Sequence, residues 1–433
     1  MGRPVLLLAM LGFAGCVRAG FQEADARPAD AAAESAQPSR DAALPWGLML
    51  PEDCSRAHWP VTAHTVKVAP QTSLLAAIQT AGPDTTLLLE PGTHALPKGA
   101  WITTPRLILR GSGGDRSQVT IDAQGADVGI GVSAPQVVVA DLTITNAASD
   151  AVHVWTESGP TISGIVLYNL ALRDASGHLV HIHNADHGVV GCSSMIVTDG
   201  FRSGLGTHCQ VLGVALGAAR GWRIFGNHIA GVWCAGSHVG AIQLRDGTRD
   251  TIIERNQILD PGLGIRAGLA TTSAPSGRTY PDPCSVPATT YVDNIGGIIR
   301  NNFIAVRAGV NHDSGIAVWN SCDTVVVHNT VFSAVTPFSS IEWRFSNTNA
   351  TVQNNLVSHN LVGRDDATAV QQANVPGAQA AWFADTSAGD LHLAAAATAA
   401  IDKGAVLVAG LGLEDIDRQP RADGKPDVGA DER

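Results

Sequence analysis

The sequence predicts an all-β solenoid, a fold in which short strands stack coil upon coil. Of the 433 residues, 45% are hydrophobic, only 15% are charged and 46 are Gly. This composition excludes a disordered chain or a coiled coil, because both need far more charge. A sequence pattern of short strands followed by an Asn recurs roughly every 28 residues. The strands are rich in β-branched residues without a helical period, so each repeat is expected to form one coil.

The first 45 residues are expected to precede the solenoid. Residues 1–15 place Arg3 ahead of a short apolar run, which is typical of a signal peptide and too short to span a bilayer. The run ends in Phe13-Ala14-Gly15-Cys16, which resembles a bacterial lipoprotein processing site with Cys16 as the lipidated residue. Residues 16–45, rich in Ala, Asp, Glu, Arg and Pro, read as a flexible tether. We therefore expect an exported lipoprotein, anchored to the outer membrane or extracellular, with a secreted or periplasmic protein as the alternative.

The seven Cys residues leave six once Cys16 carries lipid. The six are Cys54, Cys192, Cys209, Cys234, Cys284 and Cys322. In an oxidising compartment they can form as many as three disulfides, whose connectivity the sequence leaves open. Their irregular spacing contains no Cys-x-x-Cys pair, so we expect no zinc site.

The solenoid is expected to open with a short amphipathic helix at residues 73–78, which covers the first strand edge. A turn at Gly82-Pro83-Asp84 and a strand at residues 86–89 follow. Each later repeat contains an Asn whose side chain can hydrogen-bond to the next coil. These residues are Asn169, Asn227, Asn256, Asn302, Asn329 and Asn355. Residues 271–293 form a loop insertion that lengthens one repeat.

These features together resemble the right-handed parallel β-helix of the pectin-lyase-like proteins, over about residues 65–365. The tail, with Gly389-Asp-Leu-His392 and Asp427-Val-Gly-Ala-Asp-Glu432, resembles one that follows β-helices in exported bacterial proteins. The resemblance implies a single-stranded right-handed parallel β-helix over residues 46–370 and a C-terminal cap over 371–433. It also implies a relation to the polysaccharide lyases, although no specific family motif is matched in full.

Alternation of side chains along each strand predicts which residues point outward. The apolar phase leaves a cluster of cationic, aromatic and polar side chains on one outer face, around small residues at Ala215 and Gly217. Its members are His153, Trp155, His181, His183, Gln243, Arg245, Arg266, Trp319, Glu342 and Arg344. Because Trp stacks on pyranose faces and Arg binds carboxylate or sulfate, this face suits an anionic sugar.

The residues present favour elimination over hydrolysis. Glycoside hydrolysis needs two carboxylates, but this face holds only Glu342, with Asp186 and Asp246 on adjoining turns. β-Elimination from a uronate needs a cation for the carboxylate and a base for the adjacent proton. No Lys lies between Lys98 and Lys403, so the base is not a Lys on this face.

We therefore predict His181, His183 and Arg245 as the catalytic residues, with His181 or His183 as the base or acid. Arg245 and Arg266 would hold the carboxylate, and the other members of the cluster would bind substrate. Another interpretation stays open: the outward His residues are merely tolerated, and Arg266 and Arg344 form surface ion pairs.

The sequence thus predicts an exported β-helix that binds an acidic polysaccharide and cleaves it by β-elimination. A non-catalytic surface or adhesion protein and a glycoside hydrolase are the alternatives. No cofactor is predicted, although Asp186, Asp199 and Asp313 are possible Ca²⁺ ligands. The net charge of -11 argues against nucleic acid, and we expect a monomer that meets a membrane only through its lipid anchor.

Overall fold

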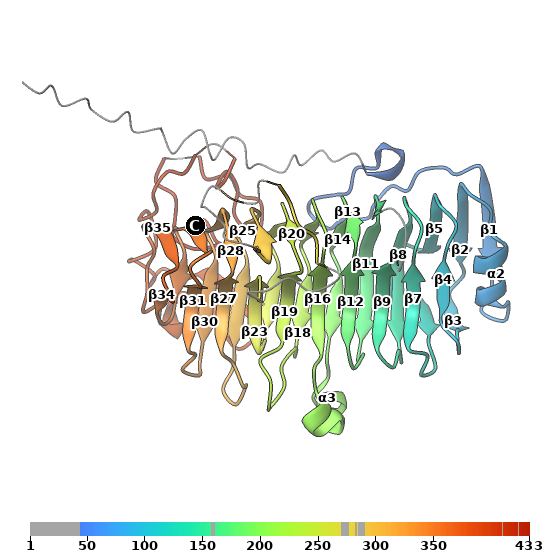
Figure 1. Ribbon diagram of the computed structural model, residues 1–433, viewed down its shortest axis with the longest axis horizontal. Helices are drawn as coiled ribbons and strands as arrows, with labels where there is room; N and C mark the ends of the chain where they lie inside the picture. The colour runs from blue at the N-terminus through green and yellow to red at the C-terminus, as the bar shows by residue number, and fades with distance from the viewer. Residues whose placement is uncertain are drawn as a thin grey trace, which may run out of the picture. The chain divides into compact units, whose positions relative to one another are not determined.

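The computed structural model describes residues 44–156, 161–269, 277–281, 284, 291–408, 410–422 and 424–433. These residues lie in one structural unit, which spans Ala36–Arg433. Within it, each long strand pairs in parallel with the equivalent strand of the next coil (Figure 1). The predicted all-β, parallel β-helix solenoid is confirmed. The predicted signal peptide, most of the tether and Cys16 lie outside the described residues.

A ten-stranded parallel sheet forms one side of the solenoid, and Figure 1 shows its strands side by side. In order of pairing its strands are β4 (Ala100–Ile102), β7 (Val128–Val132), β9 (Asp150–Trp155), β12 (His178–His183), β16 (Leu212–Gly217), β19 (Gly240–Arg245), β23 (Leu263–Ala267), β27 (Ser314–Trp319), β31 (Ser339–Arg344) and β34 (Leu361–Arg364).

A twenty-stranded sheet forms the rest of the wall in two parallel runs, which share the long strands β8 (Val138–Thr145) and β11 (Val166–Arg173). The other strands of the first run are β1 (His64–Val68), β2 (Thr85–Leu89), β5 (Leu107–Gly111), β14 (Val189–Gly191), β17 (Arg223–Phe225), β21 (Ile252–Glu254), β25 (Ile298–Arg300), β29 (Thr324–Val327), β32 (Asn349–Gln353) and β35 (Thr368–Gln372). Those of the second run are β3 (Gly92–Ala95), β6 (Val119–Asp122), β15 (Ser194–Ile196), β18 (His228–Ala230), β22 (Gln257–Leu259), β26 (Phe303–Val306), β30 (Thr330–Ser333) and β33 (Leu356–Val357).

The remaining elements are short. Two-residue strands pair at the turns: β10 (Ile162–Ser163) with β13 (Ala185–Asp186), and β24 (Asn294–Ile295) with both β20 (Thr248–Arg249) and β28 (Ser321–Cys322). The helices are α2 (Leu74–Thr80), α3 (Asp199–Leu205) and the 3₁₀ turns η1 (Pro45–Gly47), η2 (Gly206–His208) and η3 (Ala380–Trp382). No helix of the described residues is long and apolar enough to cross a membrane.

Aliphatic side chains stacked from coil to coil form the core. Val152, Val180, Val214, Ile242 and Ile265 occupy one register position on five successive strands of the ten-stranded sheet, and all are fully buried. Because each coil contributes one residue to such a column, no coil can bury its apolar face alone. The α2 helix adds Leu74 and Ile78 to this core, and Ser73 accepts a hydrogen bond from Ala76 N as its N-cap.

A ladder of Asn side chains crosses the solenoid interior as the repeat predicted. Each Nδ2 donates to the Oδ1 of the next coil at 2.9 or 3.0 Å. The members are Asn227, Asn256, Asn302, Asn329, Asn355 and Asn374. The inclusion of Asn169 was wrong: its Nδ2 donates to Asp141 Oδ1 at 2.7 Å, outside the ladder. Ser193 joins the ladder instead, donating its backbone N–H to Asn227 Oδ1 at 3.0 Å.

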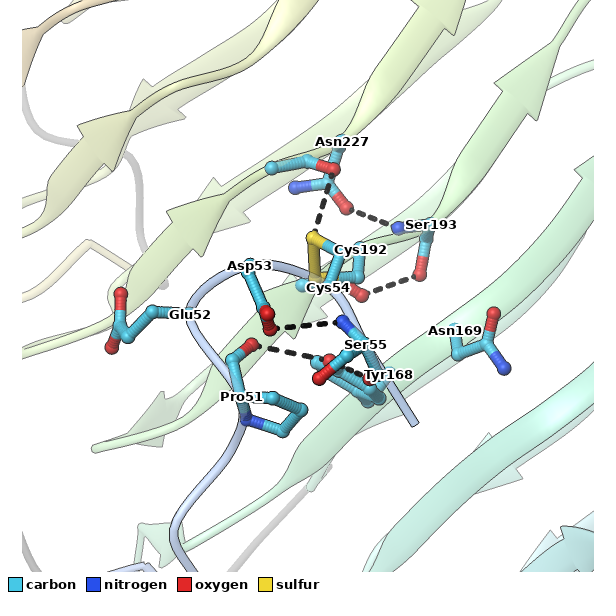
Figure 2. Close-up of a disulfide and its surroundings, with 12 residues drawn as sticks. Pro51, Glu52, Asp53, Cys54, Ser55, Tyr168, Asn169, Cys192, Ser193 and Asn227 are labelled. Carbon is cyan, nitrogen blue, oxygen red and sulfur yellow. Dashed lines mark hydrogen bonds between the residues drawn. A yellow bond between two sulfur atoms is a disulfide. The ribbon is translucent and has the colours of Figure 1, made fainter. Parts of the chain in front are cut away.

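The chain from residue 44 to the first strand lies on the outside of the solenoid and forms no coil of its own. Leu48 packs against outward apolar residues of β5, β8 and β11, including Tyr168. The Tyr168 hydroxyl donates toward Pro51 O at 3.3 Å and Ser55 O at 3.2 Å. The Cys54–Cys192 disulfide fastens this N-terminal segment to β14 and its turn (Figure 2).

Two further disulfides, Cys209–Cys234 and Cys284–Cys322, fasten loops to the solenoid. All six Cys residues that the sequence left for pairing are therefore paired. The first of these bonds joins the loop after α3 to the loop before β19, and the second anchors the insertion.

The C-terminal tail packs against the outer side of the last coils. Phe383 of β36 (Phe383–Asp385) and Leu391 of the antiparallel β37 (Asp390–Leu393) are buried with Phe303 of β26 and Leu356 of β33. Ala430 N donates to Thr330 Oγ1 at 2.9 Å, which holds the end of the chain on β30. The tail that was expected as a cap thus covers an apolar side of the solenoid.

Candidate functional site

Strand register places all ten residues of the predicted cluster on one face of the ten-stranded sheet, in two adjacent rows. We call these two rows the candidate face. Row one contains, in order, Trp101, Gly131, His153, His181, Ala215, Gln243, Arg266, Ala317, Glu342 and Val362. Row two contains Trp155, His183, Gly217 and Arg245, and further along Trp319, Arg344 and Arg364.

The centre of the candidate face has a floor of small residues. Ala215 and Gly217 of β16 separate the imidazoles of β12 from Gln243 and Arg245 of β19. A side chain at Gly217 would meet His183 Nδ1 at 2.8 Å and Asp246 Oδ2 at 3.1 Å. His183 and Asp246 therefore lean over Gly217 from opposite sides, and only Gly leaves room for both.

Charge and burial tune these groups. Arg245 Nε lies 3.4 Å from Asp246 Oδ2. Burial lowers the pKa of His183, with a further lowering by Arg245 that Asp246 opposes. Burial likewise raises the pKa of Asp246 against the effect of Arg245. His183 is thus a neutral imidazole near pH 7, which can accept a proton.

Arg266 is a buried cation without an ion-pair partner among the described residues. Its side chain is 8% exposed, its Nη2 donates to the neutral amide oxygen of Gln243, and its Nε has no hydrogen-bond partner. The guanidinium lies 5.7 Å from the ring centroid of Trp319. Burial lowers the pKa of Arg266 to about 10, and the charge of Arg245 adds to that lowering, whereas Asp293 and Asp313 oppose it from a distance. A buried cation without a direct ion pair is costly, which is typical of a group that binds an anionic ligand.

A carboxylate with three imidazoles lies at the start of β9 and β12, and the sequence analysis missed its centre. Asp150 is within 3.0 Å of His153 Nδ1, 2.8 Å of His178 Nδ1 and 3.4 Å of His181 Nδ1. The rings of His153 and His178 each stack on that of His181, at 4.4 and 4.1 Å. A sequence signal existed: Asp150-x-x-His153 and His178-x-x-His181 are 28 residues apart and in register.

Contacts within the Asp150 cluster shift the pKa values of Asp150 and His181. Burial alone would raise the pKa of Asp150, but the three imidazole hydrogen bonds hold it well below its usual range. Burial lowers the pKa of His181 to about 4, so its imidazole is neutral at pH 7. Since a carboxylate only accepts, Nδ1 of the neutral His181 ring carries the proton and its Nε2 is the basic atom.

The far end of the candidate face is held by ion pairs. Glu342 is fully buried and accepts from Trp319 Nε1 at 2.5 Å and from Arg364 Nε at 3.0 Å. Arg344 pairs with Asp365 rather than with Glu342. The predicted substrate-binding roles of Glu342 and Arg344 thus compete with structural contacts, whereas Arg364 was not foreseen.

The three possible Ca²⁺ ligands are not brought together. Asp186 is bound by Arg278 Nη1 at 2.8 Å, Asp199 pairs with Arg202, and Asp313 accepts from Ser314 Oγ at 3.2 Å. Within the described ranges, the sets of three ligand atoms close enough for one metal ion are Asp150, His178 and His181, and His392, Asp417 and Asp431.

Loops lie at both edges of the candidate face. The α3 helix precedes β16 and projects from one edge (Figure 1). At the other edge, Arg278 of the insertion donates its N–H to Asp246 O at 2.8 Å and binds Asn184, just after β12. Arg278 thus places the described part of the insertion at the border of the face. Residues 271–276, 282–283 and 285–290 of the insertion lie outside the described residues.

Comparisons with known proteins identify the fold. No protein-family model and no curated protein sequence matches the chain. Among solved structures, it is similar to a pectate lyase at 17% identity and a TM-score of 0.56, over 86% of this chain and 97% of the other. An alginate lyase from Paenibacillus sp. (16%, TM-score 0.49, 72% and 99%) and a mannuronan C-5 epimerase module from Azotobacter vinelandii (15%, TM-score 0.45, 70% and 88%) are also similar.

The chain is therefore a right-handed parallel β-helix protein. More particularly, it has the pectin-lyase-like form of that fold, which the sequence resemblance implied.

Proposed function

We propose that the candidate face binds an acidic polysaccharide and cleaves it by β-elimination. The observation that carries the proposal is Arg266, a buried guanidinium whose only hydrogen-bonding neighbour in the described residues is the neutral Gln243. A carboxylate of the ligand would form the direct ion pair that Arg266 lacks among the described residues. Arg245, in the neighbouring row and one strand away, adds a second cation to the same place.

Indole rings extend the recognition to the sugar itself. Trp155 and Trp319 lie in row two on either side of the Arg residues. Since indole faces stack on the apolar faces of pyranose rings, they would orient a chain along the solenoid axis. The pectate lyase with the same fold is consistent with this substrate class, although its identity to this chain is low.

The elimination would use His183 as the base. With the uronate carboxylate on Arg245 and Arg266, its negative charge is neutralised and the proton on the adjacent ring carbon becomes more acidic. His183 takes that proton, the electron pair forms the ring double bond, and the bond to the leaving glycosidic oxygen breaks. Water at the open face returns a proton to the leaving oxygen. Because Gly217 has no side chain, the His183 ring can lie over it, one strand away from Arg245 and the bound carboxylate.

A polysaccharide panel tests the proposal. Purified protein is incubated with polyuronates, sulfated glycans and neutral glycans, and the ultraviolet absorbance of the unsaturated uronate is followed. We expect the chromophore with a polyuronate, and its loss in His183→Ala and Arg245→Ala. Arg307→Gln is the matched control, because Arg307 pairs with Asp260 and belongs to neither row of the candidate face.

The two alternatives give different results in the same assay. New reducing ends without the chromophore would indicate a hydrolase, for which Glu342 and Asp186 are poor candidates because each is held by an Arg residue. Binding without any new ends would indicate a surface or adhesion protein. Either result would refute β-elimination.

We also propose that the chain is exported and lipidated at Cys16. Three disulfides support an oxidising compartment, where such bonds persist. Mass spectrometry of the mature protein tests this: we expect a chain that begins at a lipid-modified Cys16, and a Cys16→Ser variant released from membranes. An unmodified, unprocessed N-terminus would contradict it.

A further inference from the structure

We infer that Trp101 forms a separate sugar-stacking subsite at the β4 end of the candidate face. The inference rests on the proposed function and adds a requirement on the ligand, namely an oligosaccharide long enough to reach from Trp101 to the Arg residues. Trp101 is among the large apolar side chains that remain exposed, with 39% of its surface accessible.

The indole of Trp101 lies flat over the neighbouring strand. A Cβ added to Gly131 of β7 would point outward from the sheet and meet three indole atoms, Cδ2, Cε3 and Cε2, at 2.3 to 2.7 Å. These atoms are at and next to the bond that fuses the two rings, so the ring face covers Gly131. The opposite ring face is therefore turned away from the sheet. A free, outward aromatic face is what stacks on a pyranose.

Aromatic rings on the next coils continue this surface. The His153 ring lies 5.7 Å from that of Trp101 and 5.6 Å from that of Trp155, the second pair being stacked. The Asp150 carboxylate holds His153 by Nδ1, which keeps its ring in place. The surface is thus built from several strands, unlike a single exposed Trp.

The chemistry at this subsite differs from that at the centre. Neither Arg nor Lys occurs in either row from β4 to β12, whereas Arg245 and Arg266 occupy β19 and β23. We therefore expect the sugar on Trp101 to be recognised by its apolar face, without need for a carboxylate. Four coil steps separate β7, beneath the indole, from β19, which is about 19 Å at the usual spacing of strands. A disaccharide is too short to bridge that distance.

Binding of acidic oligosaccharides of increasing length tests the inference. Affinities of a disaccharide and a hexasaccharide of the same polyuronate are measured by calorimetry for the wild type, Trp101→Ala and Gly131→Ala, each carrying His183→Ala so that the ligand is not cleaved. We expect each variant to weaken hexasaccharide binding about tenfold, the value of one aromatic stack, while disaccharide binding is unchanged. Gly131 has no positive φ, so Ala there is tolerated by the backbone and acts by displacing the indole.

Controls separate this subsite from the proposed function. Val370→Ala removes an exposed apolar side chain outside the candidate face and should leave both affinities unchanged. Trp101→Phe keeps an aromatic ring and should retain part of the gain with length. Unchanged hexasaccharide affinity in Trp101→Ala, or an equal loss for the disaccharide, would overturn the subsite and leave the Arg site intact. If no acidic oligosaccharide binds the wild type, both proposals fail.

Discussion

Replacing Arg266 by Met should stabilise the folded protein and abolish binding of the acidic polysaccharide. Burial lowers the pKa of Arg266 from its usual value to about 10, so holding its charge in the folded state costs about 3 kcal/mol. Arg266→Met removes this cost but also loses the hydrogen bond to Gln243, which offsets the gain by about 1 kcal/mol. Since Met has a similar unbranched stem, we expect a net stabilisation of about 1 to 2 kcal/mol.

The sign of this effect fixes the pH of the measurement. Because the folded pKa lies below the unfolded one, the penalty is full below pH 10 and disappears only as the pH rises toward the pKa of the unfolded state. Urea unfolding at pH 7 should therefore show a higher midpoint for Arg266→Met than for the wild type. In the same samples, a polyuronate should raise the midpoint of the wild type and not that of the variant. A lower midpoint for ligand-free Arg266→Met would refute the reasoning, since Arg266 would then be a structural residue.

Three further predictions concern the scaffold. Asn302→Ala removes five side-chain hydrogen bonds at the ladder and should lower the free energy of unfolding by about 3 to 5 kcal/mol in denaturant titrations. The control Asn311→Ala, at a half-buried Asn outside the ladder, should lower it by less than about 1 kcal/mol. Equal effects of the two variants would contradict the ladder's role. Cys54→Ser frees the N-terminal segment and should raise the binding of a hydrophobic dye, because the apolar surface around Tyr168 is uncovered. Cys209→Ser opens only a loop and should leave dye binding unchanged. Equal dye binding by the two variants would argue that the N-terminal segment does not cover this surface. Burial lowers the pKa of His328 to about 3, so on acidification the unfolded state takes up the proton first and stability should fall as the pH drops from 6.5 toward 3. In thermal unfolding, His328→Gln should make the melting temperature depend less on pH over this range. An unchanged pH dependence would show that other groups cause it.

The fold was predictable from sequence because a solenoid repeats its local pattern. Alternation along each strand placed His181, Gln243 and Arg266 correctly in one row, since the period of two residues leaves no other phase with a buried apolar side. The Asn ladder was found for the same reason. Asn169 was misplaced by one residue, because the turn position before the ladder also favours Asn, with φ of 51°.

The parts that sequence did not reveal depend on contacts between distant residues. Asp150 and His178 lie two residues before the buried Val152 and Val180, so strict alternation would place them in the core. The pairing of Cys54 with Cys192 spans 138 residues, and nothing in the spacing selects it. Likewise, Arg266 was read as a clamp or a surface ion pair, and only the structure shows that it is buried without a carboxylate partner in the described chain.

The central claim is that the candidate face recognises the carboxylate of an acidic polysaccharide. The most direct test uses a polyuronate selected by the polysaccharide panel. Its binding is compared with that of the same polymer after the carboxyl groups have been reduced to alcohols. Chain length and sugar stacking are then matched, and only the charge differs. We expect the wild type to bind the acidic polymer and to lose that binding on reduction or on addition of salt. Equal affinity for the two polymers would contradict the claim.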